Sequence, residues 1–278
     1  MCATCGCGNT DGVRVTRLDQ PHDHGQEHPH EHPHEHPHEH APEPDTRTVD
    51  IEVALLAKND HLAAHNRKWL AAHDVLAFNV MSSPGSGKTT LLERTVGELR
   101  SGHNRWSDVS VIEGDQETAL DAQRIRATGA QVVQVNTGAG CHLDADMLAR
   151  GLQALGPLDG SLVFVENVGN LVCPALFDLG EAARVVLVSV TEGEDKPLKY
   201  PQMFAAADLV LVNKVDLLPY VEVDLDRLCG YVRQVNPTAE ILPLSVTHGD
   251  GMGSWFGWLA GTGRRSARNP LTASLDTV

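Results

Sequence analysis

Aromatic residues are scarce in this 278-residue chain: Phe, Tyr and Trp together make up 4%. No apolar run is long enough to span a bilayer, and the amino terminus lacks the apolar core of a signal peptide. The lack of a membrane-spanning run and of a signal peptide predicts a cytoplasmic protein that does not insert into membranes. Basic residues are outnumbered, 22 Lys and Arg against 37 Asp and Glu, so the formal net charge is −15. This charge argues against nonspecific binding to nucleic acid or anionic membranes.

Cysteine is sparse in the body of the chain, because three of the six cysteines lie within the first seven residues: Cys2, Cys5 and Cys7. Without a secretion signal, such close spacing favours a metal site over disulfides. Thiolates suit Zn²⁺, Ni²⁺ or Cu⁺, and the nearby α-amino group could fill the fourth position. The alternative is a disordered tail with incidental cysteines.

A low-complexity segment follows at residues 20–45, where nine of the fifteen histidines lie between His22 and His40. Interleaved Pro and Glu prevent a packed core, so we expect this segment to be disordered and extended. Dense neutral imidazoles bind several divalent metals. A solvated, pH-sensitive linker is the alternative interpretation.

The segment from 79 to 90, NVMSSPGSGKTT, has the pattern of a phosphate-binding P-loop, although Ser82 replaces the usual first glycine. A buried apolar run precedes it and a helical pattern follows it. Backbone N–H groups in such a loop point at phosphate oxygens, and the next helix adds positive potential. We expect Lys88 to contact the β and γ phosphates and Thr89 to hold Mg²⁺. The predicted nucleotide contacts here are Gly85, Ser86, Gly87, Lys88, Thr89 and Thr90.

From Val75 onward, short Val- and Leu-rich runs alternate with helix-like stretches, which predicts an α/β fold with a mainly parallel sheet and helices on both faces. We expect residues 48–73 to form a helix or helical hairpin before it, and Cys229 to lie in the core. The predicted strands are Val75–Met81, Val109–Glu113, Gln131–Val135, Leu162–Glu166, Val185–Val190, Leu209–Asn213 and Glu240–Leu244. Ligands of such sheets collect at the carboxyl ends of the strands.

The run Asn213-Lys214-Val-Asp216 ends one of these predicted strands. A carboxylate there can accept hydrogen bonds from guanine N1–H and the exocyclic amine, a donor pair that adenine lacks. We therefore expect GTP rather than ATP, with Lys214 packing on the base and Asn213 tying this loop to the P-loop. Ser245 lies where a final guanine-contacting loop is expected.

Two further strand ends carry acidic residues. Asp115 follows one strand and is a candidate for Mg²⁺ or a water, and Glu166 ends another near the expected γ-phosphate. Catalysis would be mainly positioning and charge neutralisation, with Lys88, Asp115 and Glu166 as the catalytic candidates. The alternative is that strand-end polar residues only cap the following helices.

A second metal site is predicted from Cys141-His142 and Cys173, which follow two different strands on the nucleotide side of the sheet. Three ligands are too few for a closed tetrahedral site, which a two-fold dimer could complete. Cys173 follows Glu166 closely in sequence, giving nucleotide state a physical route to metal affinity. Buried unreactive cysteines are the alternative.

These motifs closely resemble those of the HypB family of hydrogenase maturation GTPases, P-loop proteins of the SIMIBI class. The resemblance rests on CATCGC, the His-rich segment, SSPGSGKT, EGDQ, GCHLDA, ENVGNLVCP and NKVD, and covers nearly the whole chain. It implies a GTPase that inserts nickel into the [NiFe] hydrogenase large-subunit precursor. It also implies a tight nickel site at Cys2, Cys5 and Cys7, a weaker nickel or zinc site at Cys141, His142 and Cys173, nucleotide- or metal-dependent homodimers, and the maturation factor HypA as partner.

The resulting domain organisation has a cysteine motif (1–19), a His-rich linker (20–47), a GTPase domain with an amino-terminal helix (48–260) and a mobile tail (261–278). Nickel storage through the His-rich segment is the main alternative function. A urease-type maturation GTPase and a nucleotide kinase fit the motifs less well.

Overall fold

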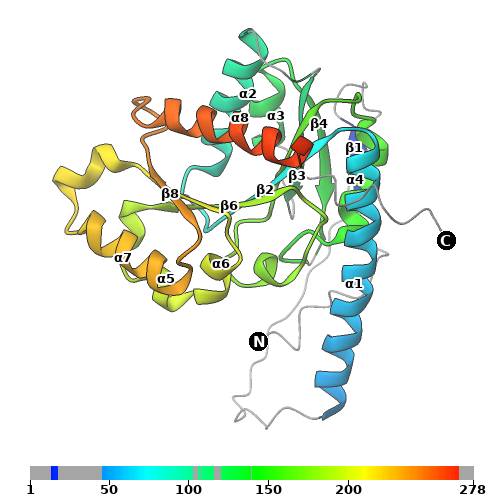
Figure 1. Cartoon of the computed structure of the whole chain (residues 1–278), viewed down its shortest axis with the longest axis horizontal. Helices are drawn as coiled ribbons and strands as arrows, with labels where there is room; N and C mark the ends of the chain where they lie inside the picture. The colour runs from blue at the N-terminus through cyan, green and yellow to red at the C-terminus, as the bar shows by residue number, and fades with distance from the viewer. Residues whose placement is uncertain are drawn as a thin grey trace, which may run out of the picture.

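The structure is a computed structural model that describes residues 14–17, 46–102, 106, 108–115, 120–138 and 140–268. The predicted metal ligands Cys2, Cys5 and Cys7, the His-rich segment and the end of the chain from 269 lie outside the described residues. The α/β prediction is confirmed: the elements alternate along the chain and build one central sheet (Figure 1).

The sheet has the strand order β1-β4-β3-β5-β2-β6-β7-β8. All seven strands from β2 to β8 pair in parallel, as expected for Val- and Leu-rich runs covered on both faces. The strands span β1 Arg14–Arg17, β2 Leu76–Ser82, β3 Val109–Asp115, β4 Gln131–Asn136, β5 Leu162–Glu166, β6 Ala183–Ser189, β7 Leu209–Asn213 and β8 Glu240–Pro243. The predicted strands thus exist, with ends shifted by one or two residues.

Strand β1 was not predicted. It pairs antiparallel with β4 at the sheet edge, so part of the segment assigned to the cysteine motif belongs to the sheet. Four residues carry too little alternation to show as a strand in the sequence, and the pairing partner lies more than a hundred residues away.

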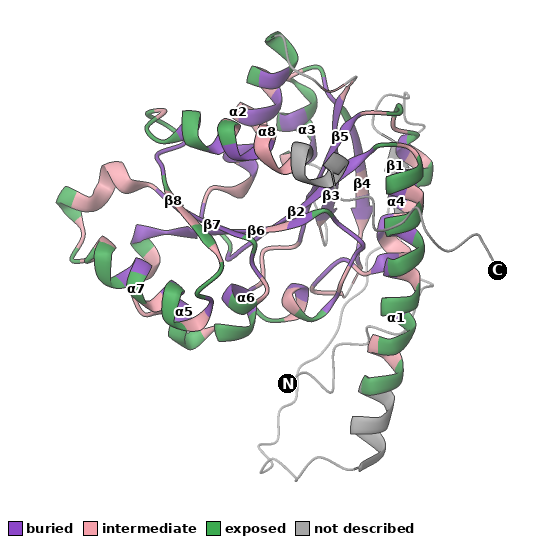
Figure 2. Cartoon of the chain, viewed as in Figure 1, coloured by how far each residue is buried: buried purple, intermediate pink, exposed green. Residues whose placement is uncertain are grey.

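Helices cover both faces of the sheet, as predicted (Figures 1 and 2). One face is packed against α2, α3 and α8, whose aromatic side chains include the fully buried Trp255. The other face is packed against α1 and α4 on one side and against α6 and α7 on the other. The helices are α1 Thr46–Ala72, α2 Lys88–Ser101, α3 Leu120–Arg126, α4 Ala145–Leu155, α5 Lys196–Lys199, α6 Pro201–Ala205, α7 Leu225–Val235 and α8 Met252–Arg268, with 3₁₀ turns η2 Cys173–Leu176, η3 Val190–Glu192 and η4 Val215–Tyr220.

Residues 48–73 lie almost entirely in one continuous helix, α1, which is the first of the two predicted forms. One boundary differs from the sequence prediction. Helix α8 runs to Arg268, so the predicted mobile tail from 261 begins inside a helix. Among the α8 residues with described side chains, the apolar ones that anchor the helix run from Met252 to Leu259. Cys229 is buried, as predicted.

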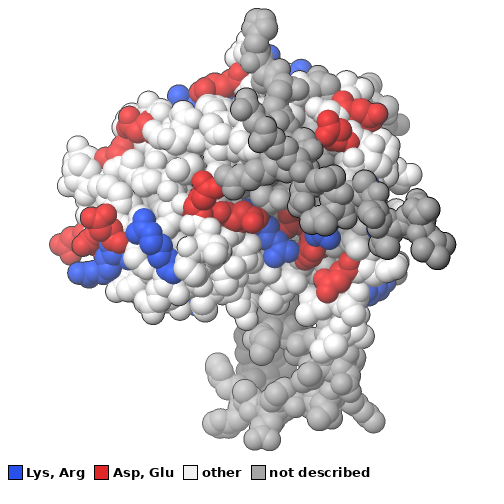
Figure 3. All heavy atoms as spheres, in the orientation of Figure 1, with Lys and Arg blue, Asp and Glu red and all other residues white. Residues whose placement is uncertain are grey.

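In the described part of the chain, no helix is both long and apolar enough to cross a bilayer. On the face shown in Figure 3, the described Lys and Arg side chains lie interspersed with Asp and Glu and form no continuous basic surface.

Candidate functional site

The P-loop connects β2 to α2 and leaves Lys88 and Thr89 at the start of the helix. The Lys88 Nζ lies 2.8 Å from Oε1 of Glu166, and Thr89 Oγ1 donates to the same oxygen at 2.7 Å. Ser86 Oγ donates to the Ser83 carbonyl at 2.9 Å, and Ser83 donates to Glu192 in the 3₁₀ turn η3, which follows β6. The loop is therefore held in shape by its own hydroxyl groups and by the turn after the neighbouring strand.

Position 87 of the P-loop requires glycine, both for its backbone conformation and for lack of space beside it. Its φ is +101°, a value that side-chain-bearing residues rarely adopt, and a Cβ there would lie 2.5 Å from Nδ2 of Asn213. That Asn213 amide donates to the Ser86 carbonyl at 2.9 Å, and its Oδ1 accepts from the Val246 N–H at 3.1 Å. Asn213 thus joins the P-loop to the loop after β8, the role predicted for it.

The predicted guanine-contacting residues gather at the carboxyl ends of β7 and β8. Lys214 adopts a left-handed backbone with φ +62°, and its Nζ donates to the Gly85 carbonyl at 2.7 Å. Asp216 Oδ2 lies 3.6 Å from Nδ1 of His248. Ser245 is fully buried, and its Oγ accepts from the His248 N–H at 3.2 Å. The loops after β7 and β8 are thus brought together beside the P-loop, where the guanine base is predicted to bind.

Three carboxylates converge beside Lys88. The register of β3 and β5 places Glu113 opposite Glu166, and Asp115 ends β3 two residues further on. Burial, together with the nearby Glu166 and Asp115 charges, raises the pKa of Glu113 to about 9. Oε2 of Glu113 and Oε2 of Glu166 are buried without a hydrogen-bond partner. Such orphaned carboxylate oxygens suit a hard cation.

These groups surround a cavity of about 560 Å³ at the carboxyl edge of the sheet. Lys88, Thr89, Asp115 and Glu166 line it, whereas the predicted contacts Ser86, Asn213, Asp216 and Ser245 are not part of its lining. The remaining predicted nucleotide contacts that line it are Gly85, Gly87, Thr90 and Lys214.

The lining residues that the sequence analysis missed include Glu113 and Arg124. Glu113 was read only as part of a strand. Arg124 of α3 reaches the cavity and donates to Thr90 Oγ1 at 3.2 Å and to Glu93 at 2.8 Å. The available signal was the basic residue in DAQRIR just downstream of the predicted Asp115.

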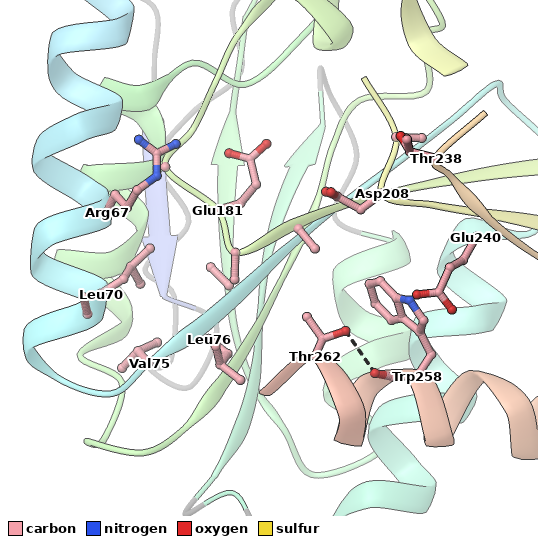
Figure 4. A pocket seen from close by; sticks show the side chains of 16 residues that line it. Arg67, Leu70, Val75, Leu76, Glu181, Asp208, Thr238, Glu240, Trp258 and Thr262 are labelled. Atoms are coloured by element: carbon pink, nitrogen blue, oxygen red, sulfur yellow. Dashed lines mark hydrogen bonds between the residues drawn. The ribbon is translucent and has the colours of Figure 1, made fainter. Parts of the chain in front are cut away.

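A second cavity, of about 660 Å³, opens at the opposite end of the strands from the P-loop (Figure 4). Arg67 of α1, Glu181, Asp208 and Trp258 of α8 line it. It lies at the amino ends of the strands, away from the edge where open parallel sheets bind ligands. The carboxyl-edge cavity is therefore the better candidate site despite its smaller volume.

Cys141, His142 and Cys173 lie together as predicted, with their ligand atoms all within 4.8 Å of one another. Cys141 Sγ lies 2.8 Å from Cys173 Sγ and 3.8 Å from His142 Nδ1. His142 is buried and stacks on Phe177 with the ring centroids 3.9 Å apart, and burial lowers its pKa to about 4. A neutral imidazole and two thiols are the donor set of a soft or borderline metal ion.

The nucleotide pocket and the Cys/His centre are joined through one residue. Asn167, fully buried, directly follows Glu166, and its Oδ1 accepts from the Leu143 N–H at 3.0 Å. Its Nδ2 donates to Asn79 in the middle of β2 at 3.2 Å. The carboxylate that contacts Lys88 and the loop that carries Cys141 and His142 therefore have a common anchor.

Comparison with known proteins agrees with this arrangement. The family described as CobW/HypB/UreG, nucleotide-binding domain, matches residues 76–243. The chain is 54% identical to the hydrogenase maturation factor HypB of Azotobacter chroococcum mcd 1 over 233 residues, which cover 84% of this chain and 74% of that protein. It is also 54% identical to HypB of Escherichia coli strain K12, with 77% and 72% of the two chains covered.

Solved structures give the same result. HypB from Archaeoglobus fulgidus superimposes with a TM-score of 0.68 at 39% identity, covering 74% of this chain and 99% of that one. HypB from Helicobacter pylori, solved in complex with nickel, gives 0.69 at 36% identity, covering 75% and 96%. The fold, the P-loop pocket and these similarities converge: this chain belongs to the CobW/HypB/UreG family and, within it, to the HypB hydrogenase maturation factors.

Proposed function

We propose that this protein is a cytoplasmic GTPase that delivers nickel to the hydrogenase large-subunit precursor, in cooperation with the maturation factor HypA. The observation that carries the proposal is that two consecutive residues, Glu166 and Asn167, contact the P-loop and the Cys/His loop respectively. Glu166 contacts Lys88 and Thr89, while Asn167 holds the loop that bears Cys141 and His142. The names of the relatives, and the nickel in the Helicobacter pylori structure, support nickel as the cargo.

GTP would bind with its phosphates in the P-loop and its base between Lys214 and Asp216. Lys88 and Thr89 both donate to Glu166 Oε1, and these bonds would compete with the proposed contacts of the same two side chains to phosphate oxygens and Mg²⁺. Thr89 and Asp115 would hold Mg²⁺, and the orphaned oxygens of Glu113 and Glu166 fit a cation at this place. When bound, Mg²⁺ supplies charge neutralisation for phosphoryl transfer. With Oε1 released by Lys88 and Thr89, Glu166 would orient the attacking water through that oxygen.

Nickel or zinc would be carried at the Cys141, His142 and Cys173 centre, whose donor set suits both ions. One chain supplies three ligands, so a homodimer with the centre at its two-fold axis would complete the coordination. Val172 and Leu176 flank Cys173 and are 40% and 42% exposed, which provides apolar surface for such a contact.

The test is a nickel titration of the full chain in which Cys2, Cys5 and Cys7 are replaced by Ser, with GDP and then with a non-hydrolysable GTP analogue. Nickel at the Cys141, His142 and Cys173 centre is followed by its thiolate-to-nickel absorption band, which nickel bound to the His-rich segment does not give. We expect the nickel affinity of this centre to differ between the two nucleotide states and the band to be lost in a Cys173→Ser variant. Equal affinity in both states would refute coupling of the two sites.

A further inference from the structure

Helix α1 buries two asparagines, Asn59 and Asn66, which are 5% and 3% exposed. They lie seven residues apart and therefore on one face of the helix. Asparagine is a poor helix former, and a buried amide is costly unless it is hydrogen-bonded. Two such residues within one helix therefore require partners, and the structure provides partners for both.

The partners are backbone groups of two distant segments. Asn59 accepts from the Ala145 N–H at 2.9 Å and donates to the Asp178 carbonyl at 2.8 Å. Asn66 donates to the Ala145 carbonyl at 2.8 Å and to the Leu179 carbonyl at 3.0 Å. Each asparagine therefore bridges the same two segments, and neither segment is a neighbour of α1 in sequence.

Both segments carry parts of the Cys/His centre. Ala145 lies three residues after His142 and begins helix α4. Asp178 directly follows Phe177, the ring on which His142 stacks, and the same segment begins with Cys173. The bridges therefore fix the spacing between the loop of Cys141 and His142 and the loop of Cys173.

The contact between α1 and the second segment is close. Gly180 has φ +89°, and a Cβ there would lie 2.4 Å from the Ala63 carbonyl and 2.9 Å from the Arg67 N–H. Arg67 Nη2 also donates to both carboxylate oxygens of Asp178, at 2.9 and 2.7 Å. At this point α1 lies backbone to backbone against the segment, which restricts how far the segment can move.

We propose that Asn59 and Asn66 are positioning residues of the Cys141, His142 and Cys173 centre. By holding the two loops together before metal arrives, they keep the two thiols in contact and lower the cost of organising the ligands. The metal-binding part of this inference rests on the proposed function, whereas the positioning of the thiols does not.

The experiment uses the full chain with Cys2, Cys5 and Cys7 replaced by Ser, so that Cys141 and Cys173 are the reactive pair. Diamide oxidises two thiols to one disulfide and takes up both hydrogens to become the hydrazine. The rate of Cys141–Cys173 disulfide formation, followed by alkylation and mass spectrometry at low protein concentration, reports thiol alignment without metal. Nickel affinity and GDP affinity are measured on the same protein.

The test variant carries Asn59→Ala and Asn66→Ala, and Asn236→Ala is the matched control. Asn236 is also buried and bonds three backbone carbonyls, at the end of α7. For the double variant we expect disulfide formation to slow and nickel affinity to fall by about tenfold, the lower end of the ~10–100-fold effect of outer-shell changes. GDP affinity should stay unchanged, and the control should leave both thiol readouts unchanged.

If the double variant does not fold, Asn66→Ala alone, which keeps the bonds of Asn59, is measured in the same way. A folded variant that oxidises and binds nickel like its parent would overturn the inference. The proposed function fails separately, if Cys173→Ser leaves nickel affinity unchanged in the parent. Disulfide formation would still decide whether the asparagines align the thiols.

Discussion

Replacing Gly87 by Ala tests whether the P-loop is shaped by the close approach of Asn213. The new Cβ would lie 2.5 Å from Asn213 Nδ2, so the amide must move and give up its bonds to the Ser86 carbonyl and the Val246 N–H. An alanine held at positive φ costs about 1–2 kcal/mol. Leaving buried hydrogen-bonding groups unpaired costs about 1–3 kcal/mol more. We expect the free energy of unfolding to fall by about 2–5 kcal/mol in total.

The assay is urea unfolding of the nucleotide-free full chain, followed by tryptophan fluorescence. Gly156→Ala is the matched control, because Gly156 has φ +59° but a Cβ there would meet nothing within 4 Å. The control should lose only the strain contribution of about 1–2 kcal/mol. GDP affinity should fall at least about tenfold in Gly87→Ala, equivalent to ~1.4 kcal/mol, and stay unchanged in Gly156→Ala. If both variants lose the same stability, the steric argument is wrong.

Three further predictions follow from the nucleotide pocket and the core. Lys88→Ala should abolish GTP hydrolysis, measured as phosphate release, because no other lysine contacts Glu166 in the described part of the chain; retained turnover would remove Lys88 from the mechanism. Asp216→Asn should shift base preference from guanine to xanthine in a competition assay, because the amide donates where the carboxylate accepted; unchanged guanine preference would place the base elsewhere. Thr95→Val should lower the free energy of unfolding by about 1–3 kcal/mol by orphaning the buried Trp255 indole N–H, which donates to Thr95 at 2.9 Å; a change below about 0.5 kcal/mol in urea titration would show that the indole finds another acceptor.

Local motifs made the nucleotide site predictable. A P-loop needs only a strand, its glycines and a helix start, all contiguous in sequence, so the position of Lys88 and Thr89 at the start of a helix could be predicted. The Cys141, His142 and Cys173 cluster was also predictable, because ligand-bearing loops after parallel strands meet at one edge of the sheet. The assignments of GTP, Mg²⁺ and nickel to these residues remain predictions.

Features that depend on register or on distant backbone were not predictable. Glu113 acquires its raised pKa only because the pairing of β3 and β5 places it opposite Glu166. Asn59 and Asn66 have backbone partners more than seventy residues away, and backbone groups carry no sequence signal. Arg124 reaches the nucleotide cavity because α3 packs beside α2, a tertiary contact that helical periodicity alone does not specify.

Helix α1 extends beyond the sheet at its amino-terminal end (Figure 1). Among the residues of α1 with described side chains, Asn59 is the first that is buried. At 1.5 Å per residue, the stretch from Thr46 to Asn59 is a rod of about 20 Å. Additional His-Pro-His-Glu units ahead of it would lengthen only the connection between β1 and α1, and would leave the bonds of Asn59 and Asn66 to the Cys/His loops in register. The histidine tract can therefore lengthen among related chains without a compensating change in these contacts.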